Sequence, residues 1–181
     1  VGQCELMYVY DKLFSEYNHT VAQLLMTGDD FEHADRYNNF INTMNKLLEF
    51  SALPIINEND TVSTDEIKVG DNDTLSAMVA VSVKADLLIL LSDIDGLYTA
   101  DPHKCDDAKP IKCVETIDED IEMLAGGKGT ELGTGGMVTK ITAAKICVKC
   151  GCDMIITNGA NPASLYDVVE DKTVGTKFSG K

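Results

Sequence analysis

Short apolar runs typical of buried strands alternate with longer segments of helical spacing along the whole chain, and this alternation constrains the fold more than any other feature. Leu87–Leu91 is continuous in apolar residues, as expected for a strand covered by helices on both faces. The other predicted strands are Val21–Met26, Leu53–Ile56, Met154–Thr157 and Val174–Phe178. The sequence therefore predicts an α/β fold with a mainly parallel sheet.

Apolar residues three and four positions apart predict the helices between these strands. The predicted helices are 4–17, 33–50, 75–83, 118–125, 137–150 and 163–169. In the first of them the apolar residues form one stripe, which we expect to be buried. Ligands of open parallel sheets bind beyond the carboxyl ends of the strands. The polar clusters after Ile56, Leu91 and Thr157 therefore mark the expected functional edge.

Composition suits one domain and excludes several partners. The 181 residues are 44% hydrophobic, which is enough for a real core. Fifteen Lys and Arg against 30 Asp and Glu give a formal net charge of -15, which disfavours nucleic acid and anionic membranes as partners. No export signal is visible, so we expect a cytoplasmic protein. The six cysteines are interpreted as reduced thiols, with Cys147, Cys150 and Cys152 as small buried residues.

Several common nucleotide and metal signatures are absent from the sequence. The Gly127-Lys128 pair lacks the following Ser or Thr of a P-loop. No Gly-x-Gly-x-x-Gly opens a helix after a strand, which argues against a Rossmann dinucleotide site. Asp93-x-Asp95-Gly96 is too short for a calcium loop and lacks its terminal Glu.

Three polar segments remain as candidates for chemistry: Pro-Ile-Ile-Asn-Glu-Asn-Asp at 54–60, Val-Gly-Asp-Asn-Asp at 69–73 and Gly-Thr-Gly-Gly-Met-Val-Thr-Lys at 133–140. In the last segment, glycines let backbone N–H groups approach a polyphosphate, and the following helix presents its positive end to that charge. Lys140 lies one helical turn inside, within reach of a transferring phosphoryl group. From the residues alone, a flexible linker with a solvated lysine is the alternative.

The other segments are also compatible with plain structural roles. The cluster 71–73 suits a helix N-cap with solvated acids. The residues 57–60 suit a turn, and Ser92 with Asp93 suits a turn cap. From the residues alone, these structural roles stay open beside the binding roles.

In combination with Ser92-Asp93-x-x-Gly96-Leu97-Tyr98, these segments resemble the glutamate 5-kinase branch of the amino acid kinase family. The resemblance covers essentially the whole chain. It implies a three-layer αβα sandwich with a mainly parallel central sheet. It also implies ATP-dependent phosphorylation of the γ-carboxylate of L-glutamate to L-glutamyl 5-phosphate, the first step of proline biosynthesis, with ATP and Mg²⁺ as cofactors.

The resemblance further implies roles for single residues. Lys140 and Asp73 are the expected catalytic residues: Lys140 stabilises the transition state, and Asp73 organises Lys140 and nearby charges. The expected glutamate ligands are Asn57, Asp60 and Asn72. The expected ATP contacts are Ser92, Asp93, Thr134, Gly135, Gly136, Met137, Val138, Thr139 and Lys140. No metal ligand is predicted.

Family members begin with a strand, a Lys-x-Gly-Ser loop and a glycine-rich substrate loop, and this sequence contains neither loop. We therefore expect one amino acid kinase domain over 1–181, incomplete at its N-terminus and without a following RNA-binding-like domain. The resemblance also implies a homodimer or homotetramer and feedback inhibition by proline.

Two alternatives stay open. One is a related kinase that acts on acetylglutamate, aspartate, carbamate or a nucleoside monophosphate. The other is an inactive fragment that binds glutamate or proline without transferring phosphate, because the N-terminal phosphate-binding lysine is missing.

Overall fold

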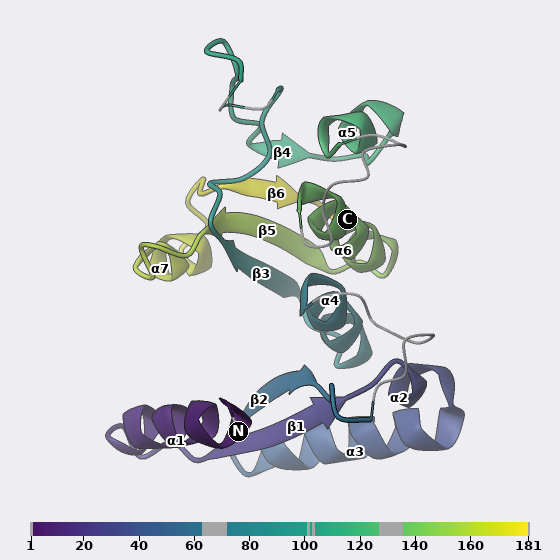
Figure 1. Ribbon diagram of the computed structural model, residues 1–181, viewed down its shortest axis with the longest axis vertical. Coiled ribbons are helices and arrows are strands. Elements are labelled where there is room, and N and C mark those ends of the chain that lie inside the picture. The colour runs from purple at the N-terminus through teal and green to yellow at the C-terminus, as the bar shows by residue number, and fades with distance from the viewer. Residues whose placement is uncertain (1, 63–71, 101, 103, 127–135, 181) are drawn as a thin grey trace. The chain divides into compact units, whose positions relative to one another are not determined.

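The computed structural model describes residues 2–62, 72–100, 102, 104–126 and 136–180 (Figure 1). Within it the chain divides into two compact units, Val1–Asn72 and Asp73–Lys181. Each unit contains a parallel pair of strands. No helix in the described ranges is both long and apolar enough to cross a membrane.

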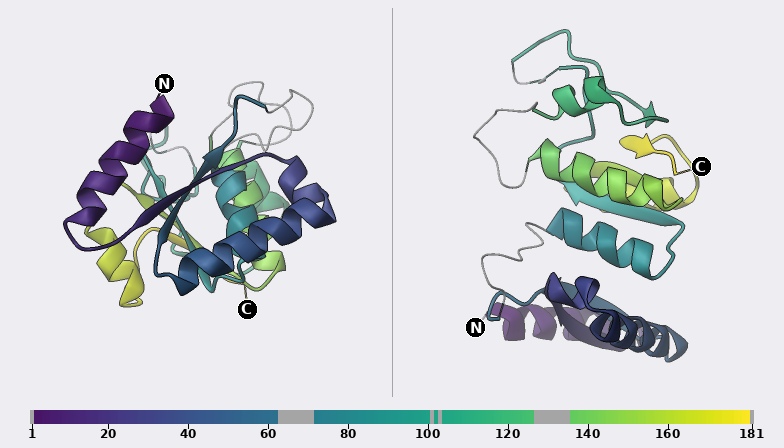
Figure 2. Two further views of the ribbon diagram at one scale, coloured as in Figure 1. Left: turned by 90° about the horizontal axis from the view of Figure 1, so that it is seen from below. Right: turned by 90° about the vertical axis from the view of Figure 1, so that its right-hand side faces the viewer.

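The first unit has helices beside a pair of parallel strands (Figure 2). Its elements are α1 (Gly2–Ser15), β1 (Val21–Met26), α2 (Asp29–Glu32), α3 (Ala34–Glu49) and β2 (Leu53–Glu58). The strand register ends with Met26 opposite Glu58. Helix α3 buries Phe40 and Met44, as its helical spacing predicts. Because the two strands are parallel and in register, the polar segments that follow them begin at the same edge.

The apolar stripe of α1 is only partly covered, so the expectation of a buried stripe is wrong. None of the residues of α1 is buried: in the stripe, Met7, Tyr10 and Phe14 are half-buried, whereas Leu13 is 52% exposed. Within its unit, α1 packs chiefly on β1. Two strands offer too narrow a surface to cover one face of a 14-residue helix. Helical spacing thus predicted the helix correctly but could not predict what covers it.

The second unit has a four-stranded sheet with the order β3-β5-β6-β4. Helices α4 and α6 lie on one side of this sheet and α7 on the other (Figures 1 and 2). The elements of the unit are α4 (Asn72–Ser82), β3 (Leu87–Ser92), β4 (Cys113–Val114), α5 (Glu119–Leu124), α6 (Met137–Lys149), β5 (Asp153–Asn158), α7 (Ser164–Val169) and β6 (Thr176–Phe178). The continuous apolar run Leu87–Leu91 is covered in part: within β3, Leu90 is buried and Leu91 is 48% exposed.

Strand directions in this sheet confirm the prediction of a mainly parallel α/β fold. Strands β3 and β5 are parallel, and their register ends with Ser92 opposite Asn158. Strand β4 is parallel to β6, whereas β6 is antiparallel to β5. The turn into β6 requires a glycine, because Gly175 has φ +65° and a Cβ there would collide with the carbonyl oxygen of Ile156. The two-residue strand β4 was not predicted, since so short a strand carries no apolar pattern.

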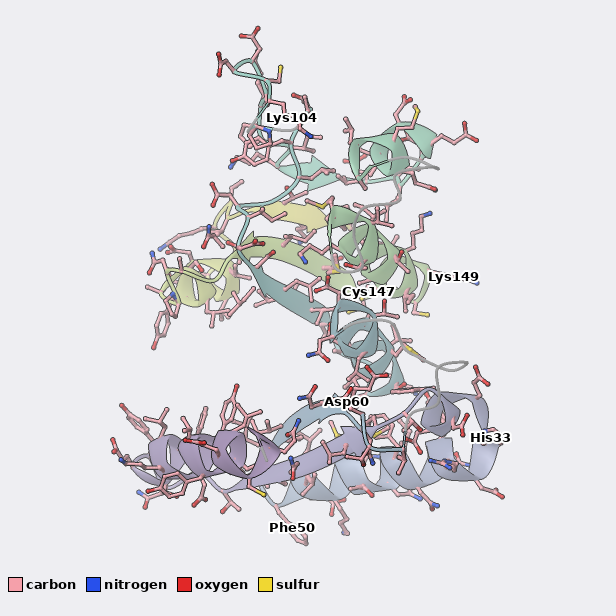
Figure 3. All side chains as sticks on the ribbon, in the orientation of Figure 1. His33, Phe50, Asp60, Lys104, Cys147 and Lys149 are labelled. Atoms are coloured by element: carbon pink, nitrogen blue, oxygen red, sulfur yellow. The ribbon has the colours of Figure 1, made fainter. Side chains whose placement is uncertain are left out.

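The C-terminal end of α6 buries two thiols (Cys147 is labelled in Figure 3). Cys152 N–H donates to the Cys147 carbonyl at 3.0 Å, and Gly151 N–H donates to the Val148 carbonyl at 3.1 Å. With Gly151 at φ +78°, this is a Schellman C-cap, which brings the side chains of Cys147 and Cys152 together. Both are buried, but Cys150, the C-cap residue, is exposed. The prediction of burial is confirmed for Cys147 and Cys152 and wrong for Cys150.

Burial raises the pKa of the Cys147 thiol to about 12, and it also raises the pKa of Cys152. A thiol in the unfolded chain ionises near pH ~8.5, so Cys147 favours folding below that pH, and its contribution is lost as the pH rises towards 12. We expect the free energy of unfolding, measured by urea denaturation, to fall less between pH 7.5 and 9.5 in Cys147→Ala than in the parent. Equal slopes would contradict this.

Candidate active site

Among the described residues, Lys140 alone is both charged and buried, with 8% of the residue exposed. It lies in the first turn of α6. Its Nζ donates to Asp73 Oδ2, in the first turn of α4, at 2.9 Å. An ammonium group without a partner is costly to bury. The ion pair with Asp73 is therefore what allows Lys140 to lie in this position.

Two hydroxyl groups hold Asp73 in place. The Thr139 hydroxyl lies 2.8 Å from Asp73 Oδ2 and 2.7 Å from the carbonyl oxygen of Gly136, so its one proton is shared between two acceptors. The Ser76 hydroxyl donates to the Asp73 backbone carbonyl at 2.7 Å. The Asp73 carboxylate thus accepts from two consecutive residues of α6 through one oxygen.

The start of α6 has the electrostatics of an anion-binding site. Its first turn contains no acidic residue, and its N-cap, Gly136, provides no side-chain hydrogen bond to the free N–H groups. A cation in the first turn of a helix is disfavoured by the helix dipole, whereas a carboxylate is favoured there. Lys140 is at the unfavourable end of α6, and Asp73 is at the favourable end of α4. This arrangement suits binding of an anionic ligand better than stability alone.

A second polar cluster lies at the carboxyl ends of β3 and β5. The Ser92 hydroxyl donates to Asp93 Oδ1 at 3.1 Å. Asn158 Nδ2 lies 2.9 Å from Asp95 Oδ1 and 3.4 Å from the Asp93 carbonyl oxygen. The Tyr98 hydroxyl donates to Asp95 Oδ2 at 3.3 Å. The parallel register, with Ser92 opposite Asn158, is what brings these residues together.

Of the expected glutamate ligands of the first unit, Asn57 lies in β2 and Asp60 follows the end of the strand. Asn57 Oδ1 accepts from the Glu58 backbone N–H at 2.9 Å. Asn59 N–H donates to the Met26 carbonyl at 2.7 Å, which joins the ends of the two strands. Asp60 lies exposed in the turn after β2 (Figure 3). These contacts fix the backbone beside Asp60 and leave its carboxylate towards solvent.

The remaining expected residues differ in the element that holds them and in their exposure. Thr134 and Gly135 lie outside the described residues. Gly136 is the N-cap of α6, and Met137 and Val138 begin the helix, with Val138 46% exposed. Asn72 is the first residue of α4 and is exposed. The structure therefore brings Asp73, Thr139 and Lys140 into direct contact.

The described residues do not form a metal site from protein side chains alone. Among them, no group of three or more His, Cys, Asp or Glu side chains is placed to hold a metal ion. Magnesium in phosphoryl-transfer sites is usually held by one or two carboxylates together with the substrate phosphates. The described residues are compatible with a magnesium ion of that kind.

Sequence reasoning assigned no role to Asn158 or Asp95, and it named Tyr98 only as part of the motif at 92–98. The signal for Asn158 was the general expectation that the polar clusters after Leu91 and Thr157 share one edge of a parallel sheet. The strand register that places Asn158 beside the residues after Ser92 becomes known only from the structure.

Comparison with known proteins shows the family of the chain. The sequence profile of the amino acid kinase family matches residues 1–158. The chain belongs to the amino acid kinase family. A glutamate 5-kinase from Clostridium tetani is 56% identical over 179 residues, covering 99% of this chain and 67% of the relative. One from Carboxydothermus hydrogenoformans is 53% identical over 181 residues, covering 100% of this chain and 48% of the relative. The chain thus spans between about half and two thirds of the length of these relatives.

Solved structures share the fold at low sequence identity. An isopentenyl phosphate kinase superposes with a TM-score of 0.67 at 19% identity, covering 98% of this chain and 66% of that one. A carbamate kinase from Giardia lamblia, solved with AMP-PNP, gives 0.64 at 16% identity, covering 93% and 65%. The predicted amino acid kinase fold and the resemblance to glutamate 5-kinases are confirmed.

Removing Asp73 leaves the enclosed Lys140 ammonium without its carboxylate. We expect Asp73→Ala to lower the free energy of unfolding by about 2 kcal/mol, in the range for a hydrogen bond to a charged group. The matched control is Asp167→Ala, which breaks an exposed ion pair with Lys172 and should cost less than about 1 kcal/mol. Urea denaturation of both variants measures the difference, and equal losses would show that the enclosed pair stabilises the fold no more than an exposed pair does.

Proposed function

We propose that this protein transfers the γ-phosphoryl group of ATP to the γ-carboxylate of L-glutamate, giving L-glutamyl 5-phosphate for proline biosynthesis. The observation that carries the proposal is Lys140, held by Asp73 at the start of α6. Full-chain similarity to glutamate 5-kinases supports the choice of substrate. The related kinases acting on acetylglutamate, aspartate, carbamate or a nucleoside monophosphate are the alternatives.

The reaction needs positive charge more than it needs a base. The γ-carboxylate of glutamate is ionised at neutral pH and is already a nucleophile, so no proton has to be removed. The difficulty is the approach of this anion to an anionic phosphoryl group. Lys140 Nζ has three protons, and the bond to Asp73 uses one of them. The others can stabilise the charge on the transferring group, together with the free N–H groups of the first turn of α6.

ATP is proposed to bind along the carboxyl ends of β3 and β5 and at the start of α6. The Ser92 hydroxyl can donate to the nucleotide, and the Asp93 carboxylate can accept from ribose or base groups. The phosphates would lie at Gly136–Lys140, where backbone N–H groups and Lys140 provide the positive field. Mg²⁺ bound to ATP would neutralise phosphate charge, and Asp73, which lies beside Lys140, is a carboxylate that could contact it.

Glutamate is proposed to bind through Asn57, Asp60 and Asn72. An exposed carboxylate such as Asp60 suits the α-ammonium group, and the two side-chain amides suit the α-carboxylate. From the family resemblance we also infer a homodimer or homotetramer and feedback inhibition by proline. We further propose a cytoplasmic location, and the net charge of -15 disfavours nucleic acid and anionic membranes as partners.

The direct test is a hydroxamate assay that traps γ-glutamyl phosphate from glutamate and MgATP. We expect Lys140→Ala to lower kcat by a factor on the order of 10² to 10³, as for other transition-state donors. Lys145→Ala, on the same helix, removes a lysine paired with Glu122 and should leave kcat within about twofold. The assay is run on this chain and on a chimera with the N-terminal segment of the Clostridium tetani relative, because the chain covers 67% of that relative.

Turnover with another acceptor but not with glutamate would replace the proposed substrate. Calorimetric binding of glutamate or proline without turnover in either form would favour a binding protein that has lost phosphoryl transfer.

Removal of the Asp60 charge should weaken glutamate binding alone. We expect Asp60→Asn to raise the KM for glutamate about tenfold, the effect of about 1.4 kcal/mol, and to leave the KM for ATP unchanged. Asp11→Asn, an exposed acid of α1, is the matched control and should change neither constant. Equal increases in both KM values for Asp60→Asn would argue against a glutamate-specific contact.

A further inference from the structure

One amide side chain, that of Asn158, joins β5 to the chain that leaves β3. Its Nδ2 lies 2.9 Å from Asp95 Oδ1 and 3.4 Å from the Asp93 carbonyl oxygen. Its Oδ1 accepts from the Ala160 backbone N–H at 2.8 Å. The donors and the acceptor of the amide are therefore all engaged, and the side chain has one orientation that satisfies them.

The Ser92–Gly96 turn contains no helix or strand beyond its first residue, so its shape depends on such contacts. Gly159 N–H donates to the Ser92 carbonyl at 2.8 Å and fixes its start. At its far end, Gly96 has φ +147°, and a Cβ there would meet Thr176 Oγ1 at 2.5 Å. Between these fixed ends, Asn158 contacts both Asp93 and Asp95.

The same turn presents the groups proposed to contact ATP. Asp93 is exposed, and its carboxylate has a described hydrogen bond only from the neighbouring Ser92 hydroxyl at 3.1 Å. That carboxylate is therefore free to accept from a ligand. Its direction depends on the backbone of Asp93, whose carbonyl oxygen Asn158 holds.

We propose that Asn158 is a positioning residue for nucleotide binding, which sets the conformation of the Ser92–Gly96 turn through Asp93 and Asp95. This inference rests on the proposed kinase function. Asn158, the last residue of β5, would then affect nucleotide affinity without contacting the phosphates or glutamate.

The test measures nucleotide and glutamate affinity separately in Asn158→Ala. We expect the Kd of MgATP, measured by calorimetry, and the KM for ATP to rise about tenfold, because two hydrogen bonds to the turn are lost. The KM for glutamate should stay within about twofold. The matched control is Asn161→Ala. Asn161 Oδ1 likewise accepts a backbone N–H two residues on, from Ala163 at 3.2 Å, and among the described residues Asn161 makes no side-chain hydrogen bond to the turn.

A reciprocal exchange tests whether the contact itself matters. Asn158→Asp places a carboxylate against Asp95 and should weaken MgATP binding at least as much as Asn158→Ala. Adding Asp95→Asn restores a donor opposite an acceptor, and we expect the double variant to recover most of the MgATP affinity.

The outcomes separate the two proposals. If neither this chain nor the chimera binds MgATP or gives the hydroxamate product, the kinase function fails. If the parent is active and Asn158→Ala behaves like Asn161→Ala, or if the exchange gives no recovery, only the role of Asn158 fails. Equal increases in the KM values for both substrates would also overturn it, since general loosening of the fold would explain them.

Discussion

The contact between Asp73 and Lys140 is the interaction on which the candidate site depends. The lysine is nearly buried at the helix end where a positive charge is least favourable, and a carboxylate at 2.9 Å offsets both costs. That carboxylate is itself in the first turn of α4, where the helix dipole favours it. The pair can form only if the N-termini of α4 and α6 lie next to each other. Their common position on one side of the β3–β5 sheet brings this about.

The strands and helices could largely be predicted from the sequence, because each has a local apolar pattern. Leu87–Leu91 is such a case: a continuous apolar run predicts a strand covered on both faces. Burial of α1 could not be predicted, since spacing reveals an apolar face but not its partner. The direction of β6 and the existence of β4 depend on contacts with distant segments. The cysteines show the same limit: position in the C-cap, rather than residue type, separates buried Cys147 from exposed Cys150.

For the site, the sequence indicated the residue types and the edge of the sheet, whereas the contacts came from the tertiary structure. Lys140 could be singled out because it follows a glycine-rich segment at a helix start. Its bond to Asp73 joins residues 67 positions apart and has no local signal. The same holds for Asn158 and Asp95, 63 positions apart. The rule that ligands bind at the carboxyl ends of parallel strands identified the region, but the register decided which side chains meet there.

Binding of the two proposed anionic substrates to an acidic protein requires positive potential that is created locally. The chain has a formal net charge of -15, so long-range attraction cannot draw ATP or glutamate to it. The first turn of α6 provides the local field through its free N–H groups and Lys140, and it contains no acidic residue. Asp73 cancels part of that charge but also orients the ammonium, so that its remaining protons are directed before the substrate arrives. Because the orientation is set in the folded protein, less reorganisation is needed when negative charge moves onto the transferring group, which is the condition under which fixed charges accelerate a reaction most.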